Sequence, residues 1–185
     1  VDFACWCTYK YLNSGPGGVG GVFVHQQHES SFDLHRFAGW WGHDKNARFK
    51  MEKKFSPMKG AQGWQISNSP VLSIAAHKAS LDIFSKAGMK RLVSKSRNLT
   101  GYLEFVLNEI RSGFPVGKEP FRLITPDDPD QRGCQISVLL HGKGKEIYDQ
   151  LILSGAVVDW RNPGEGDGGG VIRMAPVPVY NSYED

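Results

Sequence analysis

Residues 5–18 read Cys-Trp-Cys-Thr-Tyr-Lys-Tyr-Leu-Asn-Ser-Gly-Pro-Gly-Gly, and this stretch decides how the first part of the chain folds. Apolar residues run from Val1 to Cys7 and again from Gly21 to His25, which predicts two strands bounded by glycine. Lys10 lies between them, at the mouth of a turn with little side-chain bulk. A lysine in that setting can lose its proton through desolvation, and Schiff-base chemistry with a carbonyl cofactor requires a neutral amine. The spacing alone also fits a surface lysine beside a hairpin.

The two apolar strands are nearly continuous in their hydrophobicity, which predicts a sheet buried on both faces, within a larger sheet of the parallel type. In this chain alone we expect them to expose unpaired edges and apolar faces, and the N-terminal part to be poorly ordered or prone to aggregation. Gly15 to Gly20 has the Gly-x-Gly-x-x-Gly spacing of dinucleotide sites. Because a strand follows it where that mechanism needs a helix, we expect only a tight turn behind Lys10.

The rest of the chain shows helical and strand patterns in turn, after a looser segment over residues 29–64. A helix is expected from Pro70 to Gly88, with an apolar stripe formed by Val71, Leu72, Ala75, Leu81 and Phe84. The further elements are expected as a helix over 89–111, strands over 121–125 and 135–140, a helix over 145–153, and strands over 157–160 and 171–175. This order predicts a small α/β or α+β domain. Gly164 to Gly170 is predicted to be a flexible loop by its composition.

The composition is that of an ordinary globular protein, with a formal net charge of +3 and scattered basic residues. We therefore expect neither nucleic acid nor a membrane among its partners. No apolar run is as long as a membrane span. The three cysteines have no scaffold-like spacing and suit a reducing compartment, so a cytoplasmic location is expected and no metal site is predicted.

Several further blocks resemble kynureninase, the pyridoxal-phosphate enzyme of tryptophan breakdown, and most closely its eukaryotic branch. Besides residues 5–18, the blocks are Ala38-Gly39-Trp40-Trp41-Gly42-His43, Arg48-Phe49-Lys50-Met51, Ile66-Ser67-Asn68, Leu99 to Glu104, Arg132 to Gln135 and Ile172 to Ser182. The resemblance implies an α/β fold of fold-type I, the pyridoxal-phosphate transferase-like fold. Family members are much longer, so it also implies a C-terminal fragment. Residues 1–44 would be the remnant of the large cofactor-binding domain, and residues 45–185 the small domain without its last helix.

The resemblance also assigns roles to individual residues. Lys10 would carry pyridoxal 5'-phosphate, and Tyr9 would reach its phosphate or donate a proton. Trp40 and Asn68 match positions that contact the cofactor phosphate and the substrate region, across the interface of a homodimer. Arg173 matches the arginine that holds the substrate's α-carboxylate. The residues themselves favour that role, because a lone arginine on an apolar strand must find an anion if it is buried.

The implied reaction is hydrolysis of the Cβ–Cγ bond of L-kynurenine or 3-hydroxykynurenine, which gives anthranilate or 3-hydroxyanthranilate and L-alanine. This is a step of tryptophan catabolism toward NAD biosynthesis. The family's other cofactor ligands lie upstream of Val1, so we expect this chain alone to be inactive. One alternative is another fold-type I enzyme, an aminotransferase or a cysteine desulfurase-like lyase, which the placement of the cysteines in strands disfavours. A second is a non-catalytic α/β interaction module with an inert Lys10.

Overall fold

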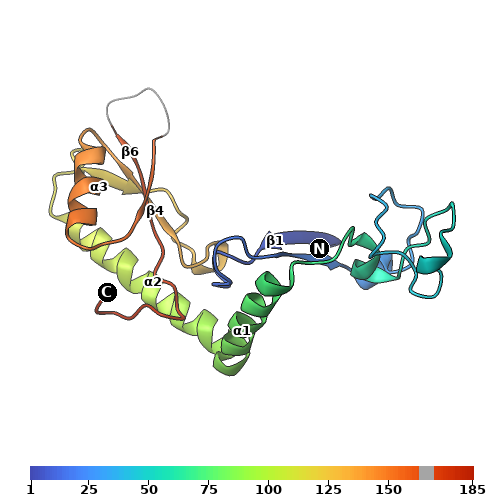
Figure 1. The fold of residues 1–185 in the computed structure, drawn as a ribbon. Helices are drawn as coiled ribbons and strands as arrows, with labels where there is room; N and C mark the ends of the chain where they lie inside the picture. Colours follow the sequence, from blue (N-terminus) through green and yellow to red (C-terminus); the bar gives the residue numbers. More distant parts are fainter. Residues whose placement is uncertain (163–168) are drawn as a thin grey trace. The chain divides into compact units, whose positions relative to one another are not determined.

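The structure, a computed structural model, describes residues 1–162 and 169–185, and it divides into two compact units, Val1–Lys86 and Ala87–Asp185. The first unit holds β1 (Phe3–Cys7), β2 (Gly20–Val24), three short 3₁₀ turns (Gln26–His28, Arg48–Lys50 and Gly60–Trp64) and α1 (Val71–Ala87), which ends at the boundary (Figure 1). The second holds α2 (Met89–Ser112), β3 (Phe121–Leu123), a 3₁₀ turn (Pro129–Gln131), β4 (Ile136–Leu140), α3 (Gly144–Leu153), β5 (Asp159–Arg161) and β6 (Gly170–Met174).

The two strands predicted for the first unit are confirmed, and they pair with each other antiparallel. The register runs from Phe3 opposite Val24 to Cys7 opposite Gly20. Residues 8–19 join the two strands by a turn, which suits an antiparallel pair, and the larger sheet of the parallel type expected around them stays a prediction. The expectation that these strands expose apolar faces in this chain alone is confirmed, since Phe3 and Trp6 are about half exposed.

Helix α1 starts directly after Pro70 and ends before Gly88, so the predicted punctuation of this helix is confirmed. Gly88 has φ +81°, a backbone conformation that suits glycine at a helix end. The predicted apolar stripe is wrong, because Phe84 is its only member that is buried, while Val71 and Leu72 are largely exposed. The helix buries Ser80 together with Phe84, which shows that it uses a partly polar face for packing.

The second unit is a four-stranded antiparallel sheet in the order β3-β4-β6-β5. Alternate residues of β4 and β6 are fully buried, because successive side chains of a strand point to opposite faces. Residues of α2 and α3 pack against this buried face, and the sheet and helices form one hydrophobic cluster (Figure 1). The cluster contains Leu103, Leu107, Phe121, Ile136, Val138, Leu140, Tyr148, Leu151, Trp160 and Ile172.

The predicted elements of the second unit are confirmed within a few residues at each end. Helix α3 ends before Gly155, whose φ of +89° favours glycine. The predicted loop over Gly164–Gly170 lies mostly on residues 163–168, outside the described residues, and Gly170 is the first residue of β6.

Two of the sequence blocks are joined by an ion pair with little exposure to solvent. Arg132 donates from both terminal nitrogens to the Glu104 carboxylate of α2, at 2.9 and 2.5 Å. This hydrogen-bonded contact with Glu104 raises the pKa of the Arg132 guanidinium, although its burial opposes the shift. The pair holds the segment before β4 against α2.

Candidate active site

Lys10 lies in the turn that follows β1, and the ends of this turn are fixed by a buried threonine. The Thr8 side chain is fully buried, and its hydroxyl donates to the Val19 carbonyl on the far side of the turn. The Thr8 carbonyl accepts hydrogen bonds from the backbone N–H and the hydroxyl of Ser14, at 3.1 and 2.8 Å. Gly15 and Gly17 have φ of +83° and +74°, so the predicted tight turn depends on glycine at these positions.

Helix α1 anchors this turn from one side. Ser14 Oγ lies 2.9 Å from His77 Nδ1, and the Ser80 hydroxyl donates to the Leu12 carbonyl. The Tyr11 and Phe84 rings are 6.0 Å apart between centroids. Residues 77, 80 and 84 recur at the spacing of one helix face. The backbone around Lys10 is therefore held through its neighbours, and none of these anchors uses the Lys10 side chain.

The Lys10 side chain is exposed, as is Tyr9 beside it. The Lys10 amine lies 5.6 Å from the centroid of the Tyr9 ring, a cation–π contact at the outer limit of useful distance. No carboxylate of the described residues forms an ion pair with Lys10. Of the predicted site residues, Lys10 and Tyr9 are therefore neighbours whose side chains are both exposed.

Trp40 belongs to an aromatic group built around one arginine. The Arg48 guanidinium carbon lies 4.9 Å from the ring centroids of both Trp40 and Trp41. Arg48 Nη2 also donates a hydrogen bond to the Trp41 carbonyl at 2.6 Å. Phe49 packs edge-on against Trp40 at 5.5 Å. Trp40 is still about half exposed, so its ring is fixed in place while one part remains available for contact.

Asn68 lies on a segment that packs against the Trp40 segment. The backbone N–H of Trp41 donates to the Ile66 carbonyl at 3.3 Å. A Cβ at Gly39 would overlap the Ile66 backbone, which explains why glycine precedes Trp40. Asn68 itself is exposed. The structure thus brings together the segments that carry Trp40 and Asn68, two of the predicted site residues.

The turn that precedes the Asn68 segment contacts the start of β1, whereas Lys10 follows the end of this strand. Phe3, at the start of β1, packs against Trp64 with ring centroids 5.5 Å apart, and Trp64 closes the turn that leads to Ile66. Lys10 follows the far end of the strand.

Arg173 is the predicted site residue of the second unit, where it lies on β6 directly opposite Asp159 of β5. Its Nε and Nη2 both lie 2.5 Å from Asp159 Oδ2, and the other oxygen, Oδ1, is 3.2 Å from Arg161 Nη2. Arg173 thus has a carboxylate partner within the chain, and its role toward a substrate carboxylate stays a prediction. Because Ile172 faces the helices, strand alternation directs Arg173 to the opposite face of the sheet.

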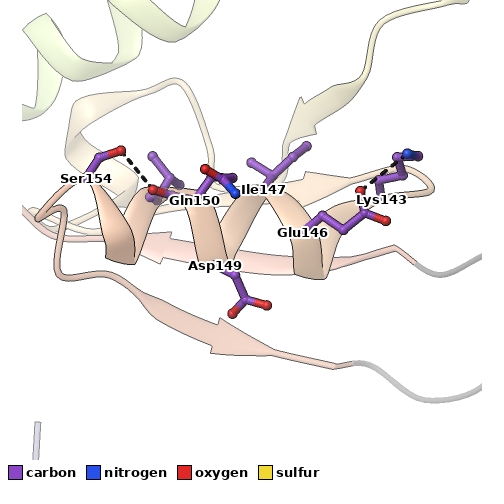
Figure 2. A pocket seen from close by; sticks show the side chains of 7 residues that line it. Lys143, Glu146, Ile147, Asp149, Gln150 and Ser154 are labelled. Atoms are coloured by element: carbon purple, nitrogen blue, oxygen red, sulfur yellow. Dashed lines mark hydrogen bonds and ion pairs between the residues drawn. The ribbon is translucent and has the colours of Figure 1, made fainter.

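Two surface hollows differ in their relation to these residues. The larger, about 640 Å³, lies along α3, and Figure 2 shows that it is lined by polar side chains such as Glu146 and Gln150, with none of the predicted site residues among them. The smaller, about 330 Å³, includes Trp40, His43, Arg48 and Phe55. The described residues contain no group of three or more His, Cys, Asp and Glu side chains arranged to hold a metal.

The cysteines are free thiols in or beside strands. Cys5 and Cys7 lie in β1, and Cys134 lies shortly before β4. Burial raises the pKa of the Cys134 thiol. A raised pKa disfavours the thiolate that acts as a nucleophile, which makes Cys134 a poor candidate for sulfur chemistry.

The residues that hold the site were not predicted. The sequence gives no signal for the contacts of Ser14 with His77 or of Ser80 with Leu12, because such side-chain contacts join positions more than 60 residues apart. Asp159 was also missed as the partner of Arg173, although a carboxylate in a neighbouring strand is the signal that could have found it.

Solved structures with the same arrangement define the class of fold. A cystine C-S lyase named C-DES, in complex with cysteine persulfide, matches all of this chain and 44% of its own, with a TM-score of 0.69 and 17% identity. A cysteine desulfurase from Thermococcus onnurineus NA1 matches all of this chain with a TM-score of 0.66 and 14% identity. The chain therefore has the α/β fold of the fold-type I pyridoxal-phosphate enzymes, as predicted. At such low identity these structures show the fold alone.

The family model described as the kynureninase C-terminal domain matches residues 92–185. The kynureninases of Flavobacterium johnsoniae and Koribacter versatilis are 53% and 48% identical to this chain over 185 residues. The chain belongs to the kynureninase family. It spans 41% of the length of these two relatives. Both are bacterial, so the expected affinity with the eukaryotic branch remains a prediction.

Proposed function

We propose that this chain contributes to an enzyme that hydrolyses the Cβ–Cγ bond of L-kynurenine or 3-hydroxykynurenine, giving anthranilate or 3-hydroxyanthranilate and L-alanine. The observation that carries the proposal is the Lys10 amine, which is exposed and has no ion pair among the described residues, on a turn anchored by Thr8, Ser14 and α1. Such a lysine in a chain of the kynureninase family fits the attachment of a carbonyl cofactor.

Pyridoxal 5'-phosphate is the cofactor that fits this residue, and it supplies an electron sink for bond cleavage next to an amino acid's α-carbon. Lys10 would hold the cofactor through its side-chain amine, and the same amine could move a proton at the substrate's Cα. Tyr9 lies next to Lys10, where its hydroxyl can donate a proton or bind the phosphate. Arg173 holds the substrate's α-carboxylate through its planar fork, which orients the bond to be cleaved.

Trp40 and Asn68 act across the interface of a homodimer in this proposal. Both side chains are exposed in this chain, so a second copy can reach them. A second copy can bring its Trp40 and Asn68 to the cofactor phosphate and the substrate. The shared site would then be incomplete in a monomer.

The remaining features of the proposal concern the whole enzyme. Residues 1–44 belong to the cofactor-binding domain and residues 45–185 to the C-terminal domain. The enzyme acts in the cytoplasm, in tryptophan catabolism toward NAD biosynthesis. None of the described helices is long and apolar enough to cross a membrane. The chain alone is proposed to bind the cofactor weakly and to lack useful activity.

Cofactor trapping tests the role of Lys10. The chain is compared with a hybrid enzyme, in which residues 1–185 replace the region that they match in the Flavobacterium johnsoniae relative. Each protein is incubated with pyridoxal phosphate and reduced with borohydride, and the labelled peptide is mapped by mass spectrometry. We expect saturable labelling of Lys10 and turnover of kynurenine in the hybrid enzyme, and weak labelling in the chain alone. Labelling scattered over surface lysines, unchanged by Lys10→Ala, would overturn the proposal.

Mixing two inactive variants tests the shared site. Hybrid enzymes with Lys10→Ala and with Asn68→Ala are co-expressed, and mixed dimers are purified through different tags. If each site takes Lys10 from one subunit and Asn68 from the other, one of the two sites in every mixed dimer is intact, so the purified mixed dimers should regain about half of the full activity. Activity that stays at the level of the separate variants would place both residues in one subunit's site.

A desulfurase-like reaction is the alternative function, because the similar solved structures include a cysteine desulfurase. These structures share only the fold with this chain, at 14–17% identity. That chemistry needs a reactive cysteine. None of the three cysteines fits that role. The pKa of Cys134 is raised, and Cys5 and Cys7 lie within a paired strand.

A further inference from the structure

Asp159 holds the guanidinium of Arg173 by one edge. Arg173 Nε and Nη2 both contact the single oxygen Oδ2, so Asp159 occupies the side of the guanidinium nearest its stem. A guanidinium carries five N–H groups in a rigid fork. Within the described part of the chain, the Nη1 side of Arg173 has no acceptor. The end of the fork, formed by Nη1 and the outer N–H of Nη2, therefore remains available to a second carboxylate.

The local charge still favours an anion at that free edge. Asp159 contributes one negative charge, and Arg173 and Arg161 contribute one positive charge each. Arg161 contacts the other oxygen of Asp159 at 3.2 Å, so the carboxylate is shared between two arginines. The group of three keeps a net positive charge, and Asp159 constrains Arg173 without cancelling its attraction for a carboxylate.

The pair contributes little to folding stability. The side chains of Arg173 and Asp159 are 35% and 40% exposed, and ion pairs this open to solvent contribute little because water and salt screen them. The antiparallel ladder of β5 and β6 fixes the two residues opposite each other by its backbone bonds. What Asp159 adds is the direction of a long, flexible side chain.

We propose that Asp159 is a positioning residue, which orients Arg173 so that its free edge receives the α-carboxylate of the amino-acid substrate, while Arg161 offsets the charge of Asp159. This inference rests on the proposed function, in which Arg173 binds that carboxylate. Asp159 lowers the conformational entropy that Arg173 loses when substrate binds, because the guanidinium is already ordered.

Kinetics of the hybrid enzyme test the proposal. Asp159→Ala is expected to raise KM for kynurenine about tenfold with a smaller change in kcat, as the loss of one pre-ordered side chain predicts. Asp159→Asn keeps an oxygen acceptor for Arg173 Nε and should restore KM to within about threefold of the unmodified hybrid. The KM of a kynurenine analogue without the α-carboxylate should not change in either variant. Asp149→Ala, which removes an exposed aspartate paired with Lys145 on α3, is the matched control and should leave both constants unchanged.

Three results separate this proposal from the proposed function. If Asp159→Ala and Asp159→Asn both lower KM, Asp159 acts through repulsion of the substrate and the positioning role is wrong. If Arg173→Ala raises KM but Asp159→Ala does not, the positioning role alone is overturned. If Arg173→Ala leaves KM unchanged, the assignment of Arg173 fails, and this inference fails with it.

A structural readout in the chain itself keeps the test independent of activity. The Nε–H of Arg173, held by Asp159, should exchange slowly with water in ¹⁵N NMR spectra. The signal should weaken in Asp159→Ala and persist in Asp159→Asn and Asp149→Ala. An Nε–H that exchanges equally fast in all four proteins would overturn the positioning contact.

Discussion

The two sheets of this protein are built alike but are buried very differently. Each contains five-residue antiparallel strands, and in each a tryptophan ring lies over a glycine: Trp6 over Gly21 in the first unit, and Trp160 over Gly170 in the second. In the first sheet Trp6 itself is 46% exposed. In the second sheet the strand residue opposite Trp160, Ile172, is 1% exposed. Similar strands therefore contribute to stability in different ways.

The difference shows where each unit obtains its order. The second unit has a hydrophobic cluster in which α2 and α3 cover one face of the sheet. The first unit has no comparable cluster among its described residues, and it fixes the Lys10 turn by hydrogen bonds to buried Thr8 and Ser14 and by contacts with α1. Packing should therefore dominate the stability of the second unit, and polar contacts should dominate the order of the Lys10 turn.

The largest expected effect comes from the core of the second unit. Ile172→Ala should destabilise this unit by about 2–5 kcal/mol, because it removes a fully buried side chain and leaves a cavity. Val22→Ala, at an exposed β-branched position of β2, should cost less than about 1 kcal/mol. Urea unfolding combined with hydrogen exchange of peptides from each unit measures both. Equal losses of stability in Ile172→Ala and Val22→Ala would show that the two sheets do not differ in how they are stabilised.

The two glycines give a matched pair with a smaller effect. A Cβ at Gly170 would overlap the Trp160 ring, which also packs against Tyr148 and cannot move without disturbing the core. Gly170→Ala should therefore destabilise the second unit by about 1–3 kcal/mol. A Cβ at Gly21 meets the Trp6 ring, but that ring can swing toward solvent, so Gly21→Ala should change stability by no more than about 1 kcal/mol.

The same hydrogen-exchange measurement decides between these expectations. A larger loss of protection for Gly21→Ala in β2 than for Gly170→Ala in β6 would show that the Trp6 ring is held more firmly than its exposure indicates.

The sequence predicts the second unit well because its pattern is set by local physics. Strands such as Ile136–Leu140 alternate between buried and half-buried residues, and α2 and α3 are bounded by glycines, so periodicity and punctuation both apply. The α1 stripe failed for the opposite reason. This helix buries Ser80 toward the Lys10 turn and leaves Leu72 exposed, and no periodicity rule anticipates a polar contact face.

The candidate site divides in the same way. Sequence blocks identify Lys10, Trp40 and Arg173 as candidates, since each lies in a stretch that resembles the family. The partners that hold them come from other elements: His77 reaches the Lys10 turn from α1, and Asp159 reaches Arg173 from a neighbouring strand. Such pairings depend on strand register and helix placement, which single residue types do not reveal.

The Lys10 turn offers a test of the polar contacts themselves. Ser14→Ala removes the hydroxyl that bonds to the Thr8 carbonyl and lies beside His77 Nδ1, and it should lower the local stability of the turn by about 1 kcal/mol. Faster hydrogen exchange over residues 8–14, with no change in β4 or β6, is the expected result. Ser154→Ala removes an exposed hydroxyl that bonds only within the end of α3, and it serves as the control. Unchanged exchange in Ser14→Ala would show that Tyr11 and Ser80 suffice to hold the turn.

The smallest effect concerns the thiol that precedes β4. Burial raises the pKa of Cys134 in the folded protein, so the folded state binds this proton more tightly than the unfolded state. The resulting stability is present below the thiol's ordinary pKa of about 8.5 and is lost as the pH rises toward the folded value. Because Cys134 is only half buried, we expect the loss to stay below about 1 kcal/mol.

Unfolding curves at pH 7 to 10 in reducing buffer, for the protein and for Cys134→Ala, isolate this contribution, since every other titrating group is common to both. The stability of the protein relative to Cys134→Ala should decrease as the pH rises above about 8.5. A difference that stays constant, or that grows with pH, would show that the environment of the thiol does not favour its protonated form. The buried core of the second unit would then begin at Ile136, and Cys134 would lie outside it.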